Sequence, residues 1–583
     1  MKLPRRLIGS CPAVGVTAIV LAAICVLLAF VPVAQAAVWT ALGTTRVFPA
    51  TKPGTQHVAE LTAAGGEYEG VIVGLRGSAQ RHVVVTWAAD SDPFLTTNAA
   101  LDQVAFVPIR HPTTGTGAKP GLYPDPLLPR NFGQVLSVPA GSSSLYLLFH
   151  VPYGSQAGIY RGTLQVANGS EQVAVPVNLQ VWSFGWQRLS VHTGFTVNFK
   201  TVGSNALATY AMLEQHGVTP LMPKAAPHVQ ANGGIGATAF ASELRPYLAS
   251  DGLDMSIARL PWLSWCPGFS WTFKPGNATL ENYLTNVLRV YQENGWQNEA
   301  VAYPVDEPTS TAAEHRAEGL ARTLHKASAR LGFRAKFLLT DDPRPTSLGP
   351  LLPANKFLWN DIDIWCVRYY YFFGRVPVLR KLQAKGAQVW WYPYYDSSVA
   401  KLPNFVIDKS LADEQVWGWL MYQWNVDGML YWNVDRWGNA LSGAGRRDPY
   451  QDPLSFQYPD GRVANGEGSL IYPGYYPRYG LDDRDAPPAS SLRLEALRDG
   501  FQDLEYLKLA TRLCGAKFVR SVVKSITWYP YKIAYGHTFN FPKYVTSPAA
   551  YDAARVKLAK AIEQAMSAQP TTSGAGPAQR GGS

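Results

Sequence analysis

The chain contains little cysteine for its length. It has only 5 Cys among 583 residues. Cys11 and Cys25 fall in an N-terminal segment that is typical of an export leader. The other three, Cys266, Cys366 and Cys514, follow no zinc or redox spacing. We therefore expect no disulfide framework, no metal site and no cofactor.

Charged residues are also scarce, at 16% of the chain against about 25% in ordinary globular proteins. Hydrophobic residues make up 47%, so the chain can bury a large core and is not disordered over most of its length. No stretch of Lys and Arg is dense enough to indicate nucleic-acid binding. Without the three basic residues of the leader, the 52 basic and 42 acidic side chains leave a net charge of +7. That excess favours solubility and a mild attraction for acidic surfaces.

The first 36 residues predict an export signal. A basic start precedes an apolar run over 14–33, and no acidic residue occurs before Glu60. The run ends in Ala34-Gln35-Ala36, a small-x-small cleavage pattern. We predict cleavage after Ala36, which gives a secreted or periplasmic protein with no stable membrane insertion. The alternative is an uncleaved anchor, because the apolar run is long enough to span a bilayer.

Residues 37–187 predict an all-β module. Turn residues such as Asn168-Gly169 separate apolar runs that are short and alternating, and the segment has no helical pattern of useful length. The clearest runs are 70–75, 82–87, 144–149, 162–166 and 174–181. We therefore expect a β-sandwich of a hundred residues or more.

From residue 188 the pattern changes to apolar strand-like runs that alternate with longer helical patterns. This alternation predicts a β/α domain with a parallel sheet. Eight candidate strands can be placed, at 191–199, 218–222, 255–260, 300–305, 335–340, 362–368, 388–394 and 428–433. Eight is the number in a closed (β/α)₈ TIM-type barrel, which we predict over 188–513.

Helices are predicted where apolar residues repeat at helical spacing. After Pro308, Thr311-Ala312-Ala313-Glu314 has the form of a capping box, an apolar periodicity follows, and Gly332 supplies the stop. A strong helix is expected over 491–513. A C-terminal helical extension over 514–566 contains a looser insert and then a helix near 549–566. The tail 567–583 is rich in Gly, Ser, Pro and Thr and should be disordered.

Carboxylates and aromatic rings gather at the predicted strand ends, where barrels of this type carry their reactive groups. The last five strands end, in order, in Asp306-Glu307-Pro308, Asp341-Asp342, Arg368-Tyr369-Tyr370, Trp390-Trp391-Tyr392-Pro393-Tyr394-Tyr395-Asp396, and Tyr431-Trp432-Asn433 before Asp435. This composition suits a sugar, because aromatic planes cover the C–H faces of the ring while a few polar groups bind its hydroxyls.

Asp306 and Glu307 are the predicted catalytic residues. Two neighbours at one strand end do not easily flank opposite faces of a sugar ring. Adjacent Asp-Glu better suits the substrate-assisted mechanism, in which the 2-acetamido group of the substrate attacks the anomeric carbon. Asp306 would hold the amide N–H, and Glu307 would protonate the leaving oxygen. The competing interpretation is that Asp306 caps the following helix and Glu307 makes a surface pair.

Other strand-end residues are candidates for substrate binding. The predicted set is Asp341, Arg368, Tyr392, Tyr394 and Trp432, with the rings forming a sugar platform. Each also has a structural interpretation, since Asp-Asp-Pro is an ordinary turn and strand aromatics often belong to the core. Trp262, Trp265 and Trp271 lie in a loop-like stretch and could form an outer subsite.

Four stretches stand out in order along the chain. They are VPYGSQAGIYRG at 151–162, YPVDEP at 303–308, DGMLYW at 427–432 and SLRLEALRDGFQDLEY at 491–506. In order and spacing they resemble glycoside hydrolase family 123 and its uncharacterised relatives. The resemblance implies a retaining β-N-acetylgalactosaminidase with substrate-assisted catalysis and no metal, in which Glu307 is the acid/base and Asp306 orients the acetamide. The charged residues of the fourth stretch, Arg493, Glu495, Arg498 and Asp503, are expected to pack and form ion pairs.

The resulting hypothesis is an exported retaining glycoside hydrolase that acts on a carbohydrate with a β-linked 2-acetamido-2-deoxy sugar. Two alternatives stay open. One is a glycosidase for a sugar without the acetamide that uses carboxylates from separate strands, such as Glu307 with Asp341. The other is a catalytically inactive carbohydrate-binding protein.

Overall fold

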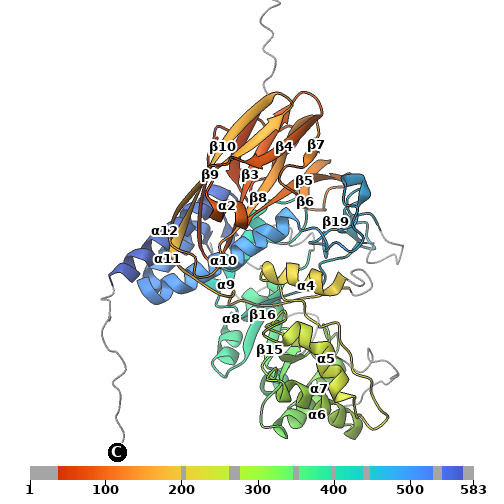
Figure 1. The fold of residues 1–583 in the computed structure, drawn as a ribbon. Helices are drawn as coiled ribbons and strands as arrows, with labels where there is room; N and C mark the ends of the chain where they lie inside the picture. The colour runs from red at the N-terminus through yellow and green to blue at the C-terminus, as the bar shows by residue number, and fades with distance from the viewer. Residues whose placement is uncertain are drawn as a thin grey trace, which may run out of the picture.

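The computed structural model describes residues 37–198, 205–261, 276–345, 353–395, 402–437, 447–528 and 541–568. The predicted leader and all but the first two residues of the predicted tail lie outside these ranges. Within them, no helix is both long and apolar enough to cross a membrane. An N-terminal β-sandwich stands over a curled parallel sheet, and the C-terminal helices lie beside both (Figure 1).

The sandwich consists of two five-stranded sheets. One has the order β1 (Ala37–Leu42), β3 (Tyr68–Gly77), β8 (Gly141–His150), β5 (Ala99–Ile109) and β6 (Gly121–Arg130). The other has the order β2 (Ala59–Gly65), β10 (Glu171–Gly185), β9 (Gly158–Asn168), β4 (Arg81–Trp87) and β7 (Val135–Val138). All neighbours are antiparallel except β10 and β2. The predicted all-β module is confirmed, and its alternating apolar residues form the core between the sheets.

One short helix in the sandwich was not predicted. α2 (Pro93–Asn98) is only 6 residues long, too short for a periodic pattern to reveal it. The Asp92 side chain accepts a hydrogen bond from the Phe94 amide, and Pro93 occupies the first turn, where its missing N–H costs nothing.

The second domain contains a seven-stranded parallel sheet. Its order is β11 (His192–Phe195), β17 (Gly428–Tyr431), β16 (Gln388–Tyr392), β15 (Ile364–Arg368), β14 (Lys336–Leu339), β13 (Ala300–Ala302) and β12 (Ala258–Arg259). The predicted second strand is reduced to a bridge. Leu221 donates to the Phe195 carbonyl and accepts from the Arg259 amide, so this bridge joins the two edge strands and closes the barrel.

A separate apolar cluster fills the inside of the barrel. Its members are Leu221, Ile257, Val301, Tyr303, Leu338, Ile364, Cys366, Trp390, Tyr392 and Leu430. Side chains alternate along a strand, so residues two positions further on point to the same side. Two positions beyond members of this cluster, the same side of the sheet carries the next layer of side chains. This layer lies at the mouth, where the parallel strands end, and consists of Arg259, Thr340, Arg368, Tyr394 and Trp432.

Helices surround the barrel strands. They are α4 (Ala206–Gln215), α5 (Ala237–Leu248), α6 (Ala278–Glu293), α7 (Thr311–Ala329), α8 (Tyr369–Gln383) and α9 (Ala412–Gln423). The predicted capping box at 311–314 is wrong by one residue. Ser310 is the N-cap and accepts from the Ala313 amide, while Glu314 lies on the buried face of α7. Gly332 ends this region with a φ of +80°, as expected.

The long helix α10 (Leu492–Cys514) lies between the sandwich and the barrel (Figure 1). Its buried charged residues pair as predicted. Arg493 pairs with Asp125 of β6, Arg498 with Glu495, and Asp503 with Arg555. Arg555 belongs to α12 (Pro548–Ser567) and also contacts Glu67 and Glu69 near β3. These ion pairs join the two domains and the C-terminal helix.

The segment predicted as a looser insert after α10 begins with a helix, α11 (Ala516–Ile526). Its apolar residues Val519, Val522, Val523 and Ile526 are buried. Two small antiparallel pairs complete the described fold. The first is the hairpin of β18 (Leu454–Gln457) and β19 (Val463–Asn465), and the second pairs β20 (Thr527–Trp528) with β21 (Lys543–Tyr544). The first hairpin follows the last barrel strand and reaches the sandwich, because Val463 bonds Thr114.

Candidate active site

The turn after β13 places Asp306 and Glu307 at the barrel mouth. Glu307 has a φ of +41°, one of three positive values among the described residues other than glycine. A side chain in this region is strained, and such strain persists only where surrounding contacts hold it. Here the Glu307 amide donates to the Thr340 hydroxyl at 2.8 Å, which ties the turn to the end of β14.

Two hydroxyl groups immobilise the Asp306 carboxylate. Its Oδ1 accepts from the Tyr303 hydroxyl at 2.6 Å and from the Thr340 hydroxyl at 2.8 Å. The guanidinium of Arg259 lies 4.7 Å from the centre of the Tyr303 ring and donates to the Tyr303 carbonyl. Within the described residues, Oδ2 of Asp306 has no hydrogen-bond partner. Asp306 is exposed, so this oxygen is available to a ligand.

Glu307 is held by Arg368 and Tyr392. Arg368 Nε donates to Glu307 Oε1 at 3.0 Å, and its Nη2 contacts Oε2. The Tyr392 hydroxyl donates to Oε1 and accepts from Arg368 Nε at 2.9 Å. Burial alone would lower the pKa of Arg368, but Tyr392 and the Glu307 carboxylate raise it on balance. Burial, and then the Glu307 charge, raise the pKa of Tyr392 well above its usual value, so its hydroxyl stays a donor.

An aromatic hollow lies beside this group. The Arg368 guanidinium is 5.2 Å from the centre of the Tyr394 ring, and the Tyr394 hydroxyl is 3.3 Å from that of Tyr370. The hollow is lined by Tyr369, Tyr370, Tyr392, Pro393, Tyr394, Leu402, Pro403 and Asn404. Tyr392 is buried and engaged through its hydroxyl, so of the two predicted platform tyrosines only the half-buried Tyr394 offers a ring face.

Asp341 follows the end of β14, as the strand pattern predicts, and its side chain is held by other protein groups. Its Oδ1 accepts from Arg344 at 2.7 Å and its Oδ2 from Asn355 at 3.2 Å, and the side chain is 7% exposed. Arg344 also pairs with the buried Glu314 of α7. This network fixes the loop after β14. Both oxygens of Asp341 are occupied by the protein, which favours a supporting role over contact with a sugar hydroxyl.

Trp432 follows the end of β17 in the mouth layer. Its indole N–H donates to Glu467 Oε1 at 2.9 Å, and the Arg436 guanidinium lies 5.7 Å from the ring centre. Asp435 is buried, and both its oxygens accept from the Asn198 amide. Trp262, Trp265, Trp271 and Asp396 lie outside the described residues.

The sequence reasoning missed Tyr303, Thr340, Arg259 and Glu467. Tyr303 and Thr340 carried a usable signal, because both stand near the ends of predicted strands next to the chosen carboxylates. Glu467 carried none, since it lies in a glycine-flanked loop without a periodic pattern. In the described part of the chain, no group of His, Cys, Asp and Glu could hold a metal ion, and Cys366 and Cys514 are free thiols.

Comparison with known proteins places this arrangement in a family. The profile described as glycoside hydrolase 123, catalytic domain, matches residues 273–510. The chain carries a family 123 glycoside hydrolase catalytic domain. The match spans the turn with Asp306 and Glu307, as well as Arg368, Tyr392 and Trp432. Among curated proteins no sequence matches the chain.

A solved family 123 enzyme shares the whole architecture. The glycoside hydrolase from Clostridium perfringens, studied for glycolipid glycan hydrolysis, covers 91% of this chain and 97% of its own with a TM-score of 0.61 and 13% identity. At that identity the likeness establishes the fold alone. A family 10 xylanase with an Ig-like domain from termite gut covers 77% of this chain and 100% of its own, with 11% identity and a TM-score of 0.26, too low to carry an argument.

Proposed function

We propose that this family 123 glycoside hydrolase cleaves a β-linked 2-acetamido-2-deoxy sugar, N-acetylgalactosamine first, by substrate-assisted catalysis with retention. The observation that supports this proposal is the state of Asp306. One of its oxygens is immobilised by Tyr303 and Thr340, and the other has no partner within the described residues. A fixed carboxylate with one free oxygen is suited to accept an amide N–H.

The acetamide needs an acceptor for its N–H and a donor for its carbonyl oxygen. Asp306 supplies the acceptor. The Arg368 guanidinium is a donor beside Glu307. The Tyr392 hydroxyl, whose single proton goes to Glu307, becomes a second donor only when it releases that carboxylate. Such contacts would press the acetamide oxygen toward the anomeric carbon, which is the arrangement that substrate assistance requires.

Glu307 is the proposed acid/base. It follows Asp306 directly, and its side chain is 39% exposed, so a glycosidic oxygen can reach it. Arg368 and Tyr392 fix the carboxylate in one orientation before substrate binds. To protonate the leaving group, Glu307 must take up a proton and exchange at least part of its contact with Arg368 for the substrate.

The mechanism with two carboxylates from separate strands has less support. Its second carboxylate would be Asp341, which is buried and held by Arg344 and Asn355. A nucleophile must face the anomeric carbon with a free oxygen. Asp341 would have to leave both partners first.

Export of the enzyme also remains our proposal, supported by the basic start, apolar run and Ala34-Gln35-Ala36 of the leader. An exported enzyme would meet glycans and glycoconjugates outside the cytoplasm. Glycolipid glycans, on which the Clostridium perfringens relative was studied, are a candidate substrate class.

A panel of chromogenic β-glycosides tests the proposal. We expect hydrolysis of 2-acetamido sugars and none of the matching 2-hydroxy sugars. A thiazoline mimic of the bicyclic intermediate should inhibit tightly. Activity confined to sugars without the acetamide, or no inhibition by the thiazoline, would rule out substrate assistance.

Substitutions of Asp306 and Glu307 test whether these two residues carry out the reaction. Glu307→Gln should lower kcat on poor leaving groups by about 10²–10⁴-fold, with a smaller loss on good leaving groups, because general acid catalysis has that range. Asp306→Asn should reduce activity on all leaving groups alike. Glu318→Gln is the control, since Glu318 pairs with Arg322 on the exposed side of α7. Near-normal rates in both site variants would contradict the assignment.

A further inference from the structure

Arg436 lies at the barrel mouth, above the end of β17. Leu430 belongs to the barrel interior, and Trp432 follows two residues later on the same side. The Arg436 guanidinium lies 5.7 Å from the centre of the Trp432 ring. That distance is within the range of a cation–π contact. A guanidinium therefore lies over an indole ring just beyond the end of this strand.

The indole under Arg436 is itself anchored. Trp432 donates its ring N–H to Glu467, whose carboxylate is buried and also accepts from the Tyr395 amide at 3.2 Å. The Arg436 amide donates to the Gly468 carbonyl at 2.9 Å. Gly468 has a φ of +71°, and a Cβ there would lie 2.3 Å from the Trp432 ring, so the loop packs directly on the indole. Backbone and ring together fix where Arg436 can reach.

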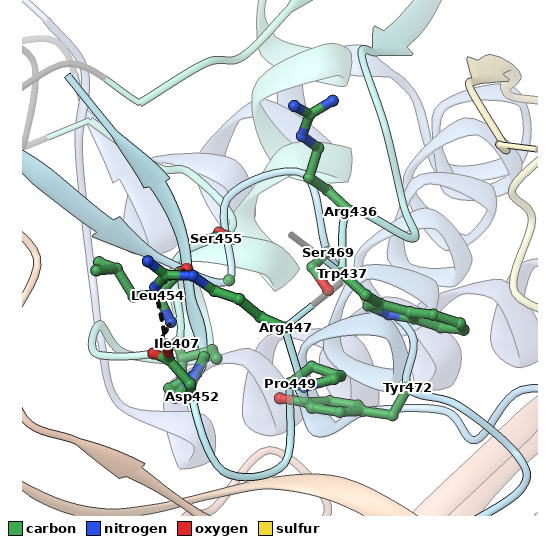
Figure 2. Close-up of a pocket in the computed structure, with 12 residues that line it drawn as sticks. Ile407, Arg436, Trp437, Arg447, Pro449, Asp452, Leu454, Ser455, Ser469 and Tyr472 are labelled. Atoms are coloured by element: carbon green, nitrogen blue, oxygen red, sulfur yellow. Dashed lines mark hydrogen bonds and ion pairs between the residues drawn. The ribbon is translucent and has the colours of Figure 1, made fainter. Parts of the chain in front are cut away.

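Arg436 has no counter-charge in the described part of the chain. No carboxylate pairs with it, and no acceptor bonds its guanidinium there. Its neighbour Asp435 faces the Asn198 amide instead. Arg436 is one of the residues that line the pocket around Arg447 and Tyr472, but Figure 2 shows its guanidinium directed away from the other side chains there. Arg447 pairs with Asp452 at 3.0 Å. Arg368, by contrast, is paired with Glu307.

We propose that Arg436 binds an anionic substituent, a sulfate or a carboxylate, on the glycan that enters the active site. The inference rests on the proposed function and deepens it, because it names an acidic 2-acetamido glycan as the preferred substrate class. The N–H groups of a guanidinium lie in one plane and form a fork. This planar fork matches the oxygens of a carboxylate or sulfate and binds a neutral hydroxyl less strongly.

The test compares two aryl β-glycosides of the same 2-acetamido sugar, one unsubstituted and one carrying a 6-O-sulfate. A third substrate, extended by a uronic acid, distinguishes carboxylate from sulfate. We expect wild-type kcat/KM to favour at least one acidic substrate, and Arg436→Gln to reduce that preference about tenfold or more. Arg436→Lys should keep part of it, since the charge remains without the fork. High salt should weaken the preference.

Arg484→Gln is the matched control. The exposed Arg484 guanidinium lies 4.4 Å from the centre of the Tyr475 ring, a comparable contact with a different ring. Its loss should leave the ratio of acidic to neutral kcat/KM unchanged. Equal ratios in wild type and Arg436→Gln, or equal effects of Arg436→Gln and Arg484→Gln, would overturn the proposal.

A direct binding measurement distinguishes failure of the anion site from failure of the proposed reaction. Calorimetry measures the affinity of wild type and Arg436→Gln for the 6-O-sulfated and the unsubstituted N-acetylhexosamine. This measurement needs no turnover. If the enzyme cleaves no 2-acetamido glycoside but binds the sulfated sugar through Arg436, the proposed reaction fails and the anion site stands. If cleavage occurs but neither acidic group is preferred in rate or binding, the anion site fails alone.

Discussion

The guanidinium of Arg368 faces the Glu307 carboxylate edge-on and contacts both of its oxygens. The two residues come from β15 and from the turn after β13, two strands that are separated in the sheet by β14. Tyr392 of β16 adds a third contact to the same carboxylate. Three strand ends therefore converge on one side chain, and that side chain occupies a strained turn. Its orientation is set by the fold before any substrate arrives.

Arg368→Gln should therefore reduce kcat about 10–100-fold on poor leaving groups. The reason is that a hydrogen bond to a charged group contributes about 1.5–3 kcal/mol, and its loss lets the acid/base leave its working position. The measurement is kcat on aryl glycosides of graded leaving-group ability. Arg334→Gln is the control, because Arg334 pairs with Asp363 where β14 and β15 begin, at the opposite end of the barrel. Full activity of Arg368→Gln would show that Glu307 needs no such support.

Tyr303→Phe and Thr340→Val should each lower kcat/KM on 2-acetamido glycosides by about 5- to 10-fold. Each substitution removes one of the two donors on Asp306 Oδ1, and a single hydrogen bond contributes about 1 kcal/mol. The double variant should approach the loss seen in Asp306→Asn. Tyr291→Phe is the matched control, because the buried Tyr291 hydroxyl has no partner within the described residues. An effect of Tyr291→Phe equal to that of Tyr303→Phe would contradict the argument.

Much of the barrel mouth could be predicted because strand ends are visible in sequence. Buried parallel strands read as apolar runs, and the polar residues that follow them must meet at one rim. In this way the sequence predicts that Asp306, Glu307, Arg368 and Tyr392 lie at one rim, and the structure brings Arg368 and Tyr392 onto Glu307 there. The same rule does not say whether a strand-end carboxylate faces the cavity or the protein. Asp341 turns to Arg344, whose position in the loop after β14 depends on Glu314 in α7.

Residues supplied by loops could not be predicted. Glu467 is 36 residues beyond the end of β17 at Tyr431 and meets Trp432 only because Gly466 and Gly468 let the loop turn against the ring. The extent of backbone pairing in the second predicted strand, 218–222, could not be predicted either. Its apolar residues are present, but the backbone pairs at one bridge only, because pairing depends on where its neighbours end.

The pair Arg493–Asp125 should be essential to stability. Both side chains are fully buried, and Arg493 also donates to the carbonyls of Phe405, Gly466 and Ser469. Arg493→Met leaves a buried carboxylate without its main partner and should lower the free energy of unfolding by about 3–5 kcal/mol. Denaturant unfolding measures this. Arg322→Met, at an exposed pair on α7, should cost less than about 1 kcal/mol. Equal losses in the two variants would show that the domain junction does not depend on Arg493.

Glu467 should make the stability depend on pH near neutrality. Burial raises the pKa of this carboxyl from its ordinary 4.5 to about 7, although Trp432 and the Tyr395 amide bond it. The folded state therefore holds the proton more tightly than the unfolded chain does. The resulting stability is complete below about pH 4.5 and is lost as the pH rises to about 7, by about 3 kcal/mol.

Glu467→Gln cannot ionise but keeps an oxygen that accepts from Trp432. The free energy of unfolding of wild type relative to this variant should fall by about 3 kcal/mol between pH 4.5 and 8 and stay constant above that. Chemical denaturation at a series of pH values measures the difference. Glu60→Gln, at an exposed position of β2, controls for the loss of a carboxylate as such. Parallel pH curves for wild type and Glu467→Gln would mean that Glu467 is ionised as readily in the fold as in the unfolded chain, and that its buried oxygen is reached by water.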